Sequence, residues 1–511
     1  MSVTLGDIAL AASGTVEPAA AASVPLSGVG FDSRRVSRGE LFLALPGTRV
    51  DGHDYVAQAL RAGAAAALVQ RAPTATGSAA VGPLVLVADT VSALTEIATA
   101  LHRDLAQAGT RTVAITGSNG KTTTKDLLAH VLRTVSGSPD AVAAPPGSYN
   151  NEVGLPVTVI RAAIATQRPR HLILEMGARG AGHIRGLCAI APPDIGVVLM
   201  VGSAHLAEFG SREALARAKA EMAEGVGPTG VCILNADDPI VAAMAARTSA
   251  RVVGFGTVAA ADVRAFDVDI DAAACARFTL GFDGVRAPVA LPLPGPHHVT
   301  NALAVAAVAL TEGYGVEEVA AALSTPGEVS PHRMAVTARP DGVTILDDAY
   351  NANPESMAAA LRSLAVLGRS RGKGGRTWAV LGEMLELGEA AGTEHDAIGR
   401  LAVRLNINRL VVVGQGARAL HLGAQQEGSW GGESQWVSDA DAARAVLEKE
   451  LAAGDVVLVK ASNSVRLWQL ATDLISTDVL ATDVLAADLV ATHPAPAAPG
   501  RGVPLGSGGA P

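Results

Sequence analysis

The sequence predicts an α/β protein of three domains: a small α/β domain, a central domain with a doubly wound parallel sheet, and a C-terminal Rossmann-like α/β domain. The chain has 511 residues, which at about 150 residues per domain gives about three domains. Hydrophobic residues make up 49% of the chain but aromatic residues only 3%, so the cores must consist mainly of Ala, Val and Leu. Such cores suit helices packed on parallel strands better than an aromatic-rich sandwich.

The first predicted domain covers residues 1–106. Short apolar runs predict strands at 41–45, 66–69 and 85–87. A helix is predicted over 55–62, between the first two strands. This mixture indicates a small α/β unit.

The second predicted domain covers residues 107–329 and alternates apolar strands with helices. Its predicted strands lie at 113–115, 172–174, 195–200 and 231–234. Continuous apolar strands of this kind are typical of a parallel sheet with both faces covered. Such a sheet binds a nucleotide at the carboxyl ends of its strands.

The third predicted domain covers residues 330–475 and repeats the strand–helix alternation, with strands at 343–346, 377–381, 410–413 and 456–459. Residues 476–511 form a low-complexity segment that ends in a tail rich in Pro, Gly, Ala and Ser, which we expect to be mostly disordered. Before the tail, aspartates recur every five residues at Asp473, Asp478, Asp483 and Asp488. That period matches neither a helix nor a strand.

The composition excludes several classes of protein. A net charge of −9 argues against a nucleic-acid-binding surface, which needs clustered Lys and Arg. The three cysteines, Cys188, Cys232 and Cys275, are too few and too widely spaced for a disulfide framework or a Cys-x-x-Cys metal site. No basic leader precedes Asp7, and no apolar run reaches membrane-spanning length. We therefore expect a cytoplasmic protein without membrane insertion.

A glycine-rich segment at residues 116–124 follows the apolar run 113–115 and precedes a helix-like pattern. In this order, backbone N–H groups and the helix N-terminus can surround phosphates, Lys121 can reach the outer phosphates, and the Thr122 hydroxyl can bind Mg²⁺. The segment predicts a P-loop, ATPase-like site for a nucleoside triphosphate. Position 115 is Ile where the longer form of this loop has Gly, and an ordinary strand-to-helix turn is the alternative.

Two further residues stand at predicted strand ends of this domain. Glu175 ends the run 171–174, where a carboxylate can hold Mg²⁺ beside the phosphate loop, and His205 follows the strand that ends near residue 200. Each has a structural alternative, because Glu175 could cap a helix and His205 could form loop hydrogen bonds. A phosphate loop alone also leaves kinases, GTPases, ATPases and ligases open.

Ordered motifs along the chain resemble those of the Mur ligases, ATP-dependent amide-forming enzymes of peptidoglycan precursor synthesis. The motifs that carry the resemblance are residues 116–123, 150–156, 175–178, 205–211, 218–221, 235–238, 297–304 and 332–334. The resemblance spans about residues 30–470. It implies a role in cell-wall formation, and with it in cell shape and division.

Third-domain motifs narrow the resemblance to the branch of the family that adds D-alanyl-D-alanine: the run Asp347-Asp348-Ala349-Tyr350-Asn351-Ala352-Asn353-Pro354, followed by residues 381–388 and His395. The motifs at residues 31–35 and 39–47 agree with this branch, since they resemble the UDP-substrate domain shared by the tripeptide-stage and dipeptide-stage members. The Asp-Asn-Pro-Arg tetrapeptide of the diaminopimelate- or lysine-adding members is absent. Another Mur ligase, a folylpolyglutamate-synthase-like enzyme and a noncatalytic nucleotide-binding regulator remain as alternatives.

The resemblance implies a chemistry and a set of catalytic residues. ATP transfers its γ-phosphoryl group to a carboxylate of the UDP-N-acetylmuramoyl-tripeptide, and the amine of D-alanyl-D-alanine attacks the acyl phosphate. Lys121, His205 and Lys219 are the implied catalytic residues, and two Mg²⁺ ions are held by Thr122, Glu175, His205 and Lys219. Lys219 serves as a carbamate, since a free ammonium has no lone pair to offer a metal. From position alone, an ordinary helix lysine is the alternative.

The resemblance also implies binding residues for ATP and both substrates. ATP is bound by Gly117, Ser118, Asn119, Gly120, Lys121, Thr122, Thr123, Asn301, Arg333 and Asp348. The UDP substrate is bound by Ser33, Arg34 and Asn151, and the dipeptide by Asn351, Asn353 and Ser356. Asn301 could instead cap a helix, and Asp32-Ser33 could be a turn. Lys460 offers a cation for a ligand carboxylate. We expect a monomer.

Overall fold

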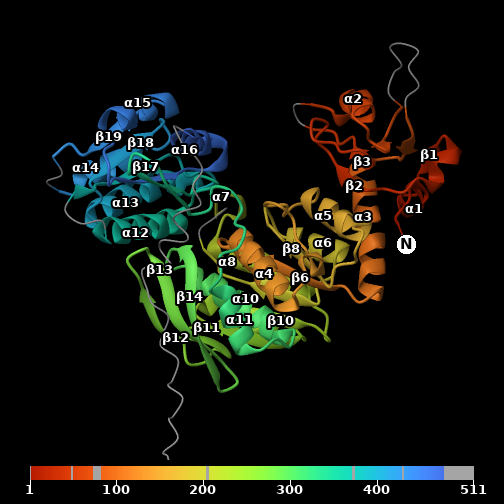
Figure 1. Ribbon diagram of the computed structural model, residues 1–511, viewed down its shortest axis with the longest axis horizontal. Helices are drawn as coiled ribbons and strands as arrows, with labels where there is room; N and C mark the ends of the chain where they lie inside the picture. The colour runs from red at the N-terminus through yellow and green to blue at the C-terminus, as the bar shows by residue number, and fades with distance from the viewer. Residues whose placement is uncertain are drawn as a thin grey trace, which may run out of the picture.

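The computed structural model describes residues 2–47, 50–72, 82–202, 206–370, 374–428 and 431–476. It contains three sheets, one in each of the three predicted segments, and confirms the α/β class (Figure 1). The exact domain boundaries stay predictions, and the tail predicted to be disordered lies outside the described residues. Within the described part of the chain, no helix has the length and apolar character needed to cross a membrane.

The first sheet has five strands in the order β1-β5-β4-β3-β2, all parallel except β1. Its strands are β1 (Thr15–Glu17), β2 (Gly28–Gly30), β3 (Glu40–Leu43), β4 (Ala66–Val69) and β5 (Leu84–Leu86). Its helices are α1 (Leu5–Ala11), α2 (Val56–Arg61) and the long α3 (Thr90–Gln107). The predicted strands and helix are confirmed, whereas β1 and β2 were not predicted because each contains a single apolar residue other than glycine, Val16 or Val29, and so forms no apolar run.

The central sheet has nine strands in the order β14-β13-β12-β11-β10-β9-β6-β8-β7. The parallel part consists of β6 (Arg111–Thr116), β7 (Val142–Ala143), β8 (His171–Glu175), β9 (Ile195–Val198), β10 (Val231–Asn235), β11 (Arg251–Gly256) and β12 (Val263–Ile270). An antiparallel extension follows with β13 (Cys275–Phe282) and β14 (Val285–Pro294).

The doubly wound parallel sheet is confirmed, and the antiparallel extension is an addition to it that was not predicted. Its strands alternate buried and exposed residues, a pattern typical of a sheet with one solvated face, rather than forming continuous apolar runs. Pro288 and Pro292 interrupt β14, which lies at the sheet edge, where a missing N–H costs no ladder hydrogen bond.

Helices cover both faces of the central sheet, as a doubly wound fold requires. Val113 and Ile115 of β6 belong to the core formed with α4 (Lys121–Ser136), α10 (His298–Thr311) and α11 (Val316–Leu323). Ala114 between them belongs to the opposite core, with α5 (Gly154–Ile164), α6 (His183–Ile190) and α8 (Arg212–Gly225). The short helices α7 (Leu206–Phe209) and α9 (Pro239–Ala242) complete this domain. The second core continues through α3 into the first domain.

The third sheet has six strands in the order β15-β16-β20-β17-β18-β19, and only β15 is antiparallel. The strands are β15 (Ala335–Ala338), β16 (Thr344–Asp347), β17 (Thr377–Leu381), β18 (Arg409–Val413), β19 (Ser434–Val437) and β20 (Val456–Lys460). Helices α12 (Pro354–Ser370), α13 (Ala391–Arg404) and α14 (Arg418–Gln426) cover one face, and α15 (Ala440–Glu450) and α16 (Leu467–Ser476) cover the other. The predicted Rossmann-like arrangement is confirmed.

One member of the five-residue aspartate repeat is described. Asp473 lies on α16 and forms an ion pair with Arg444 of α15, so it links the two helices of that face. The other three aspartates lie outside the described residues.

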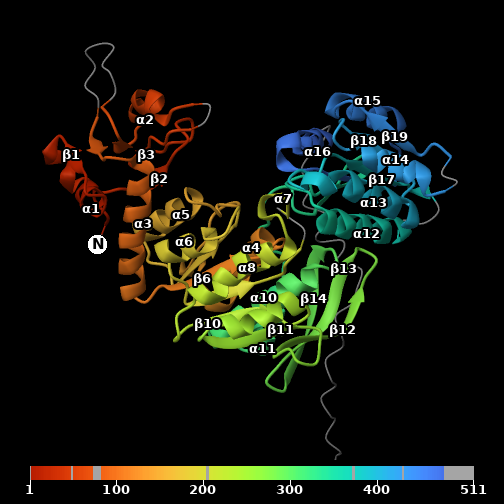
Figure 2. The same ribbon diagram turned by 180° about the vertical axis from the view of Figure 1, so that it is seen from behind.

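The first and third domains both rest on the central domain (Figure 1), and the reverse view in Figure 2 shows the same arrangement. Helix α7 lies between the central and third domains in both views. At the junction with the third domain, the Ser330 N–H donates to Asp126 Oδ2 of α4 at 2.8 Å. The carboxyl ends of the central strands and the start of the third domain therefore meet near α4.

Candidate active site

The predicted strand–loop–helix order of the phosphate loop is confirmed between β6 and α4. Gly120 has a φ of +84°, and a Cβ there would lie 2.5 Å from Asn301 Oδ1, so both backbone and space require glycine. Ser118 fixes the loop to the end of β9, since its N–H donates to Met200 O at 3.0 Å and its Oγ accepts from Gly202 N at 3.0 Å. The backbone of the loop is thus shaped by the protein itself.

Lys121 is the first residue of α4 and points back over the loop. Its Nζ donates to Gly117 O at 2.5 Å and to Ser118 O at 3.4 Å. Burial lowers the pKa of Lys121 to about 8, although the carboxylate of Glu175 opposes the shift. An ammonium that has lost part of its hydration is suited to bind phosphate oxygens here, because these oxygens replace the lost water molecules.

The third domain contributes Arg333 to the same place. Its Nη2 donates to Thr122 Oγ1 at 3.1 Å, and its guanidinium lies over the Tyr350 ring, 4.0 Å from the centroid. The buried Arg333 Nε has no hydrogen-bond partner in the described structure. The structure therefore brings this predicted phosphate contact to the loop, and Tyr350, whose role the sequence did not indicate, supports it.

Glu175 is fully buried at the carboxyl end of β8, opposite Ile115 of β6. It ends a strand and caps no helix, so the structural alternative for this residue is wrong. Its Oε2 accepts from Ser148 Oγ at 3.0 Å, while Oε1 has no partner among the described residues. Burial raises the pKa of Glu175, and the positive charges of Lys125, Lys121 and Arg333 act in the opposite direction.

The donors near the loop suit a hard divalent cation. Glu175 Oε1 is an orphaned carboxylate oxygen, and the Thr122 hydroxyl is buried beside it in the first turn of α4. Among the described residues, no cluster of three or more His, Cys, Asp or Glu side chains could hold a metal ion. Further ligands for a cation here would have to include oxygens of the nucleotide or of water.

Lys219 lies on α8 and is only 1% exposed. Burial lowers its pKa far below the usual value, and the nearby charge of Lys121 adds to this effect, against the attraction of Glu221. Lys219 is thus a helix lysine, as in the alternative, but a buried one, and its role as a carbamate stays a prediction. The neighbouring Glu221 accepts hydrogen bonds from Gly182 N and Arg185 N and so holds the start of α6. His205 lies outside the described residues, and its assignment stays a prediction.

Asn301 is the fourth residue of α10 and lies within the helix, so it does not cap it. It is buried against the phosphate loop, and its Nδ2 contacts His298 Nδ1 at 3.2 Å. The adjacent His297 and His298 each keep one buried ring nitrogen without a partner among the described residues. Burial lowers the pKa of both, to about 4 for His297, so they are neutral near pH 7. Sequence reasoning assigned no role to this pair.

Asp348 and Lys460 form a buried ion pair within the third domain, with Lys460 Nζ 2.6 Å from Asp348 Oδ2. Lys460 also donates to Asn351 O at 2.8 Å and to Asp348 O at 3.4 Å. All three of its hydrogens therefore have protein acceptors. In the described structure Lys460 therefore fixes the loop after β16, and its contact with a ligand carboxylate stays a prediction.

Two of the three predicted dipeptide residues form the start of α12. Ser356 N donates to Asn353 Oδ1 at 3.0 Å, and Asn353 N donates to Ser356 Oγ at 3.1 Å. Asn353 Nδ2 also reaches across the domain junction to Asn119 Oδ1 of the phosphate loop, at 2.6 Å. Only Asn351 is exposed. These contacts tie the start of α12 to the loop that would hold the phosphates.

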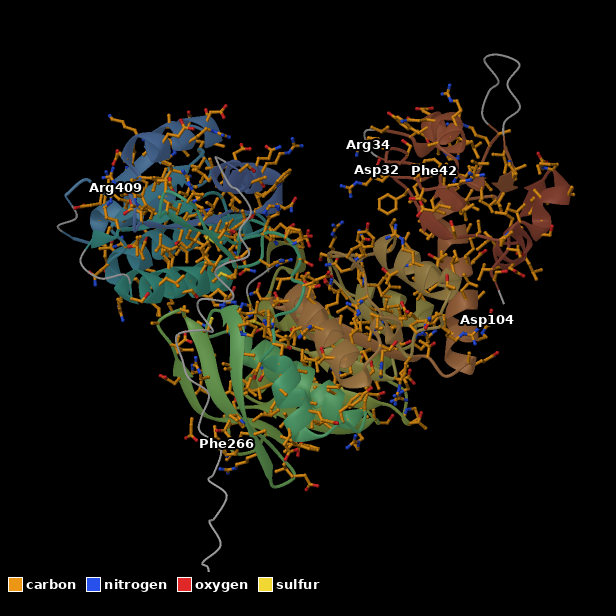
Figure 3. The ribbon with its side chains drawn as sticks, viewed as in Figure 1. Asp32, Arg34, Phe42, Asp104, Phe266 and Arg409 are labelled. Atoms are coloured by element: carbon orange, nitrogen blue, oxygen red, sulfur yellow. The ribbon has the colours of Figure 1, made fainter. Side chains whose placement is uncertain are left out.

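The predicted UDP-substrate residues lie apart from the phosphate loop. Figure 3 shows Asp32 and Arg34 on the side of the first domain that faces the third domain. Arg34 pairs with Asp32 through two contacts of 2.9 Å and holds the pKa of that carboxyl down to about 2. Asp32 also accepts from Arg34 N, so the turn proposed as an alternative is present. Asn151 Oδ1 accepts from Gly154 N, at the first residue of α5, at 2.8 Å.

Comparison with known protein families gives matches along most of the chain. The Mur ligase middle domain matches residues 115–309, and the Mur ligase, glutamate ligase domain matches residues 332–463. The Mur ligase family, catalytic domain matches residues 25–118.

Several proteins that are similar to this chain over most of its length are named as ligases of this family. A UDP-N-acetylmuramoyl-tripeptide–D-alanyl-D-alanine ligase of Mycobacterium tuberculosis is 51% identical over 88% of this chain and 92% of its own length. One from Bacillus subtilis is 34% identical over 92% of this chain and 98% of its own. The crystal structure of MurF from Acinetobacter baumannii superposes with a TM-score of 0.78 at 29% identity, covering 93% of this chain and 99% of that one.

The Thermotoga maritima MurF ligase in complex with ADP superposes with a TM-score of 0.70 at 28% identity, over 88% of this chain and 96% of that one. The three matched domain models and the relatives that are 34% and 51% identical show that the similarity covers most of the chain and not only single motifs. The chain belongs to the Mur ligase family and is an ATP-dependent, amide-bond-forming ligase.

Proposed function

We propose that the chain joins D-alanyl-D-alanine to UDP-N-acetylmuramoyl-tripeptide, with ATP converted to ADP and orthophosphate. The observation that carries the proposal is the meeting of the phosphate loop, buried Glu175 and buried Lys219 in the central domain with Arg333 of the third domain. The 51% identical relative with this name supports the choice of substrates. The reaction takes place in peptidoglycan precursor synthesis, and we place the protein in the cytoplasm as a monomer.

Phosphoryl transfer from ATP to a carboxylate brings two anions together, so the protein must supply positive charge and in-line positioning. Lys121 and Arg333 supply charge from opposite sides of the domain junction. Asn301 and Asp348 are the proposed contacts to adenine and ribose. Two Mg²⁺ ions would add positive charge, one held by Thr122 and Glu175, the other by His205 and the carbamate of Lys219.

The environment of Lys219 supports its proposed modification. The neutral amine, favoured by burial, attacks the carbon of CO₂, forms an N–C bond and releases a proton. The product is an anion, whereas the free ammonium would repel a cation. In this form Lys219 would offer carboxylate oxygens to a divalent cation from α8.

The remaining substrate contacts are proposed at the domains that flank the phosphate loop. Ser33, Arg34 and Asn151 would contact the UDP substrate. The loop formed by Asn351, Asn353 and Ser356 would receive the dipeptide, with exposed Asn351 free to contact it directly.

Substrate preference tests the proposal. With ATP, Mg²⁺ and UDP-linked tripeptide, D-alanyl-D-alanine should give a UDP-pentapeptide detectable by mass spectrometry. Free D-alanine should react far less well. It lacks the amide of the dipeptide, so polar groups of the pocket that bind this amide would be left without a partner. Equal use of single amino acids would assign the chain to an earlier-acting member of the family, and no product with any UDP-peptide would favour a noncatalytic regulator.

A further inference from the structure

The orientation of the Glu175 carboxylate depends on a residue outside the proposed metal site. A buried carboxylate can rotate about its last bond and present either oxygen. Ser148 Oγ donates to Oε2 at 3.0 Å, and this leaves Oε1 as the oxygen without a partner. The two oxygens are equivalent, so the serine fixes the plane of the carboxylate and keeps one oxygen without a protein partner.

The Ser148 hydroxyl is itself oriented. It accepts a hydrogen bond from Asn150 Nδ2 at 2.9 Å, so its own hydrogen is left for Glu175. Asn150 is in turn anchored beyond the end of β8, because its carbonyl accepts from Gly177 N at 2.8 Å. Three hydrogen bonds therefore connect Glu175 through Ser148 and Asn150 to Gly177. The backbone from Gly177 to Glu175 closes the loop.

Lys125 holds the loop that carries Ser148. It lies one turn after Lys121 on α4 and is 1% exposed. Its Nζ donates to Pro145 O at 2.6 Å and to Gly147 O at 3.3 Å, and it pairs with Asp126 Oδ1 at 2.7 Å. The helix of the phosphate loop thus fixes the segment directly before Ser148.

We propose that Ser148 is a positioning residue that turns Glu175 Oε1 toward the divalent cation bound with the nucleotide, and that Lys125 fixes the Ser148 loop for this purpose. The inference rests on the proposed function, in which Glu175 binds that cation. Partners that orient a ligand side chain commonly change metal affinity by about 10- to 100-fold when removed. A merely structural serine would affect stability and not metal affinity.

The test measures Mn²⁺ binding by electron paramagnetic resonance in the presence of the β,γ-imido analogue of ATP. Ser148→Ala should weaken Mn²⁺ binding by about tenfold or more, while affinity for the analogue without metal stays within about twofold of wild type. Ser148→Thr, which keeps a hydroxyl, should restore most of the affinity. Ser136→Ala is the matched control, because Ser136 Oγ donates only to the backbone carbonyls of Arg133 and Ser138.

A second variant keeps the test decisive if Ser148→Ala folds poorly. Lys125→Met should weaken Mn²⁺ binding in the same direction in a protein whose thermal melt shows it to be folded. Unchanged Mn²⁺ affinity in folded Ser148→Ala, when Glu175→Gln lowers it, would overturn the positioning role alone. Unchanged affinity in Glu175→Gln as well would overturn the metal assignment on which the inference rests.

Discussion

Lys121→Ala should lose at least about a thousandfold in kcat, in the range for removing charge stabilisation from a developing anion. Lys121 is the ammonium of the phosphate loop and its burial has already removed much of its hydration. The fold should remain intact, because Gly120 and the Ser118 contacts define the turn without it. Orthophosphate release measures the rate, and circular dichroism measures the fold.

The control for this variant is Lys449→Ala, which removes an exposed lysine on α15. It should behave as wild type in both measurements. Near-normal turnover of Lys121→Ala would contradict the assignment of the ATP site.

Lys219→Ala should be almost inactive and should regain part of its activity when formate or acetate is added. The added carboxylate would fill the space of the carbamate and replace its charge near the proposed second cation. Lys219→Arg should stay inactive, since a guanidinium does not form a carbamate at neutral pH. Steady-state rates with and without added carboxylate measure the effect.

An independent readout separates a carbamate from a simple packing role. Wild-type protein equilibrated with ¹³CO₂ should give a carbamate carbon signal by NMR that Lys219→Ala lacks. A fully active Lys219→Ala enzyme, or a wild-type protein without such a signal, would show that Lys219 is not modified.

Strong local patterns explain which parts of the fold the sequence could predict. The centres of buried strands such as β6, β9 and β20 are continuous apolar runs, which predict strands. The glycine loop before Lys121 lies between a predicted strand and a predicted helix, and this order indicates a phosphate-binding loop. The antiparallel strands β13 and β14 were missed because one of their faces is exposed, so they form no continuous apolar run.

The positions of Lys121 and Glu175 could be predicted because each follows a recognisable apolar strand, Lys121 after the glycine loop and Glu175 directly at the strand end. Contacts between segments that lie far apart in the sequence could not be predicted. Ser148 and Lys125 reach Glu175 and its loop only through tertiary folding, and Lys460 could be understood only once its buried partner Asp348 was visible. Asn353 likewise is a helix cap and a domain contact at once, which no spacing in the sequence reveals.

Isotope transfer tests most directly whether the central domain activates a carboxylate by phosphorylation. The tripeptide substrate carries ¹⁸O in its reacting carboxylate, and ³¹P NMR follows the products with ATP, Mg²⁺ and D-alanyl-D-alanine. We expect ADP and orthophosphate that contains one ¹⁸O, because amine attack on the acyl phosphate leaves one carboxylate oxygen on phosphorus. AMP with pyrophosphate, or orthophosphate free of the label, would contradict phosphorylation of the substrate carboxylate at this site.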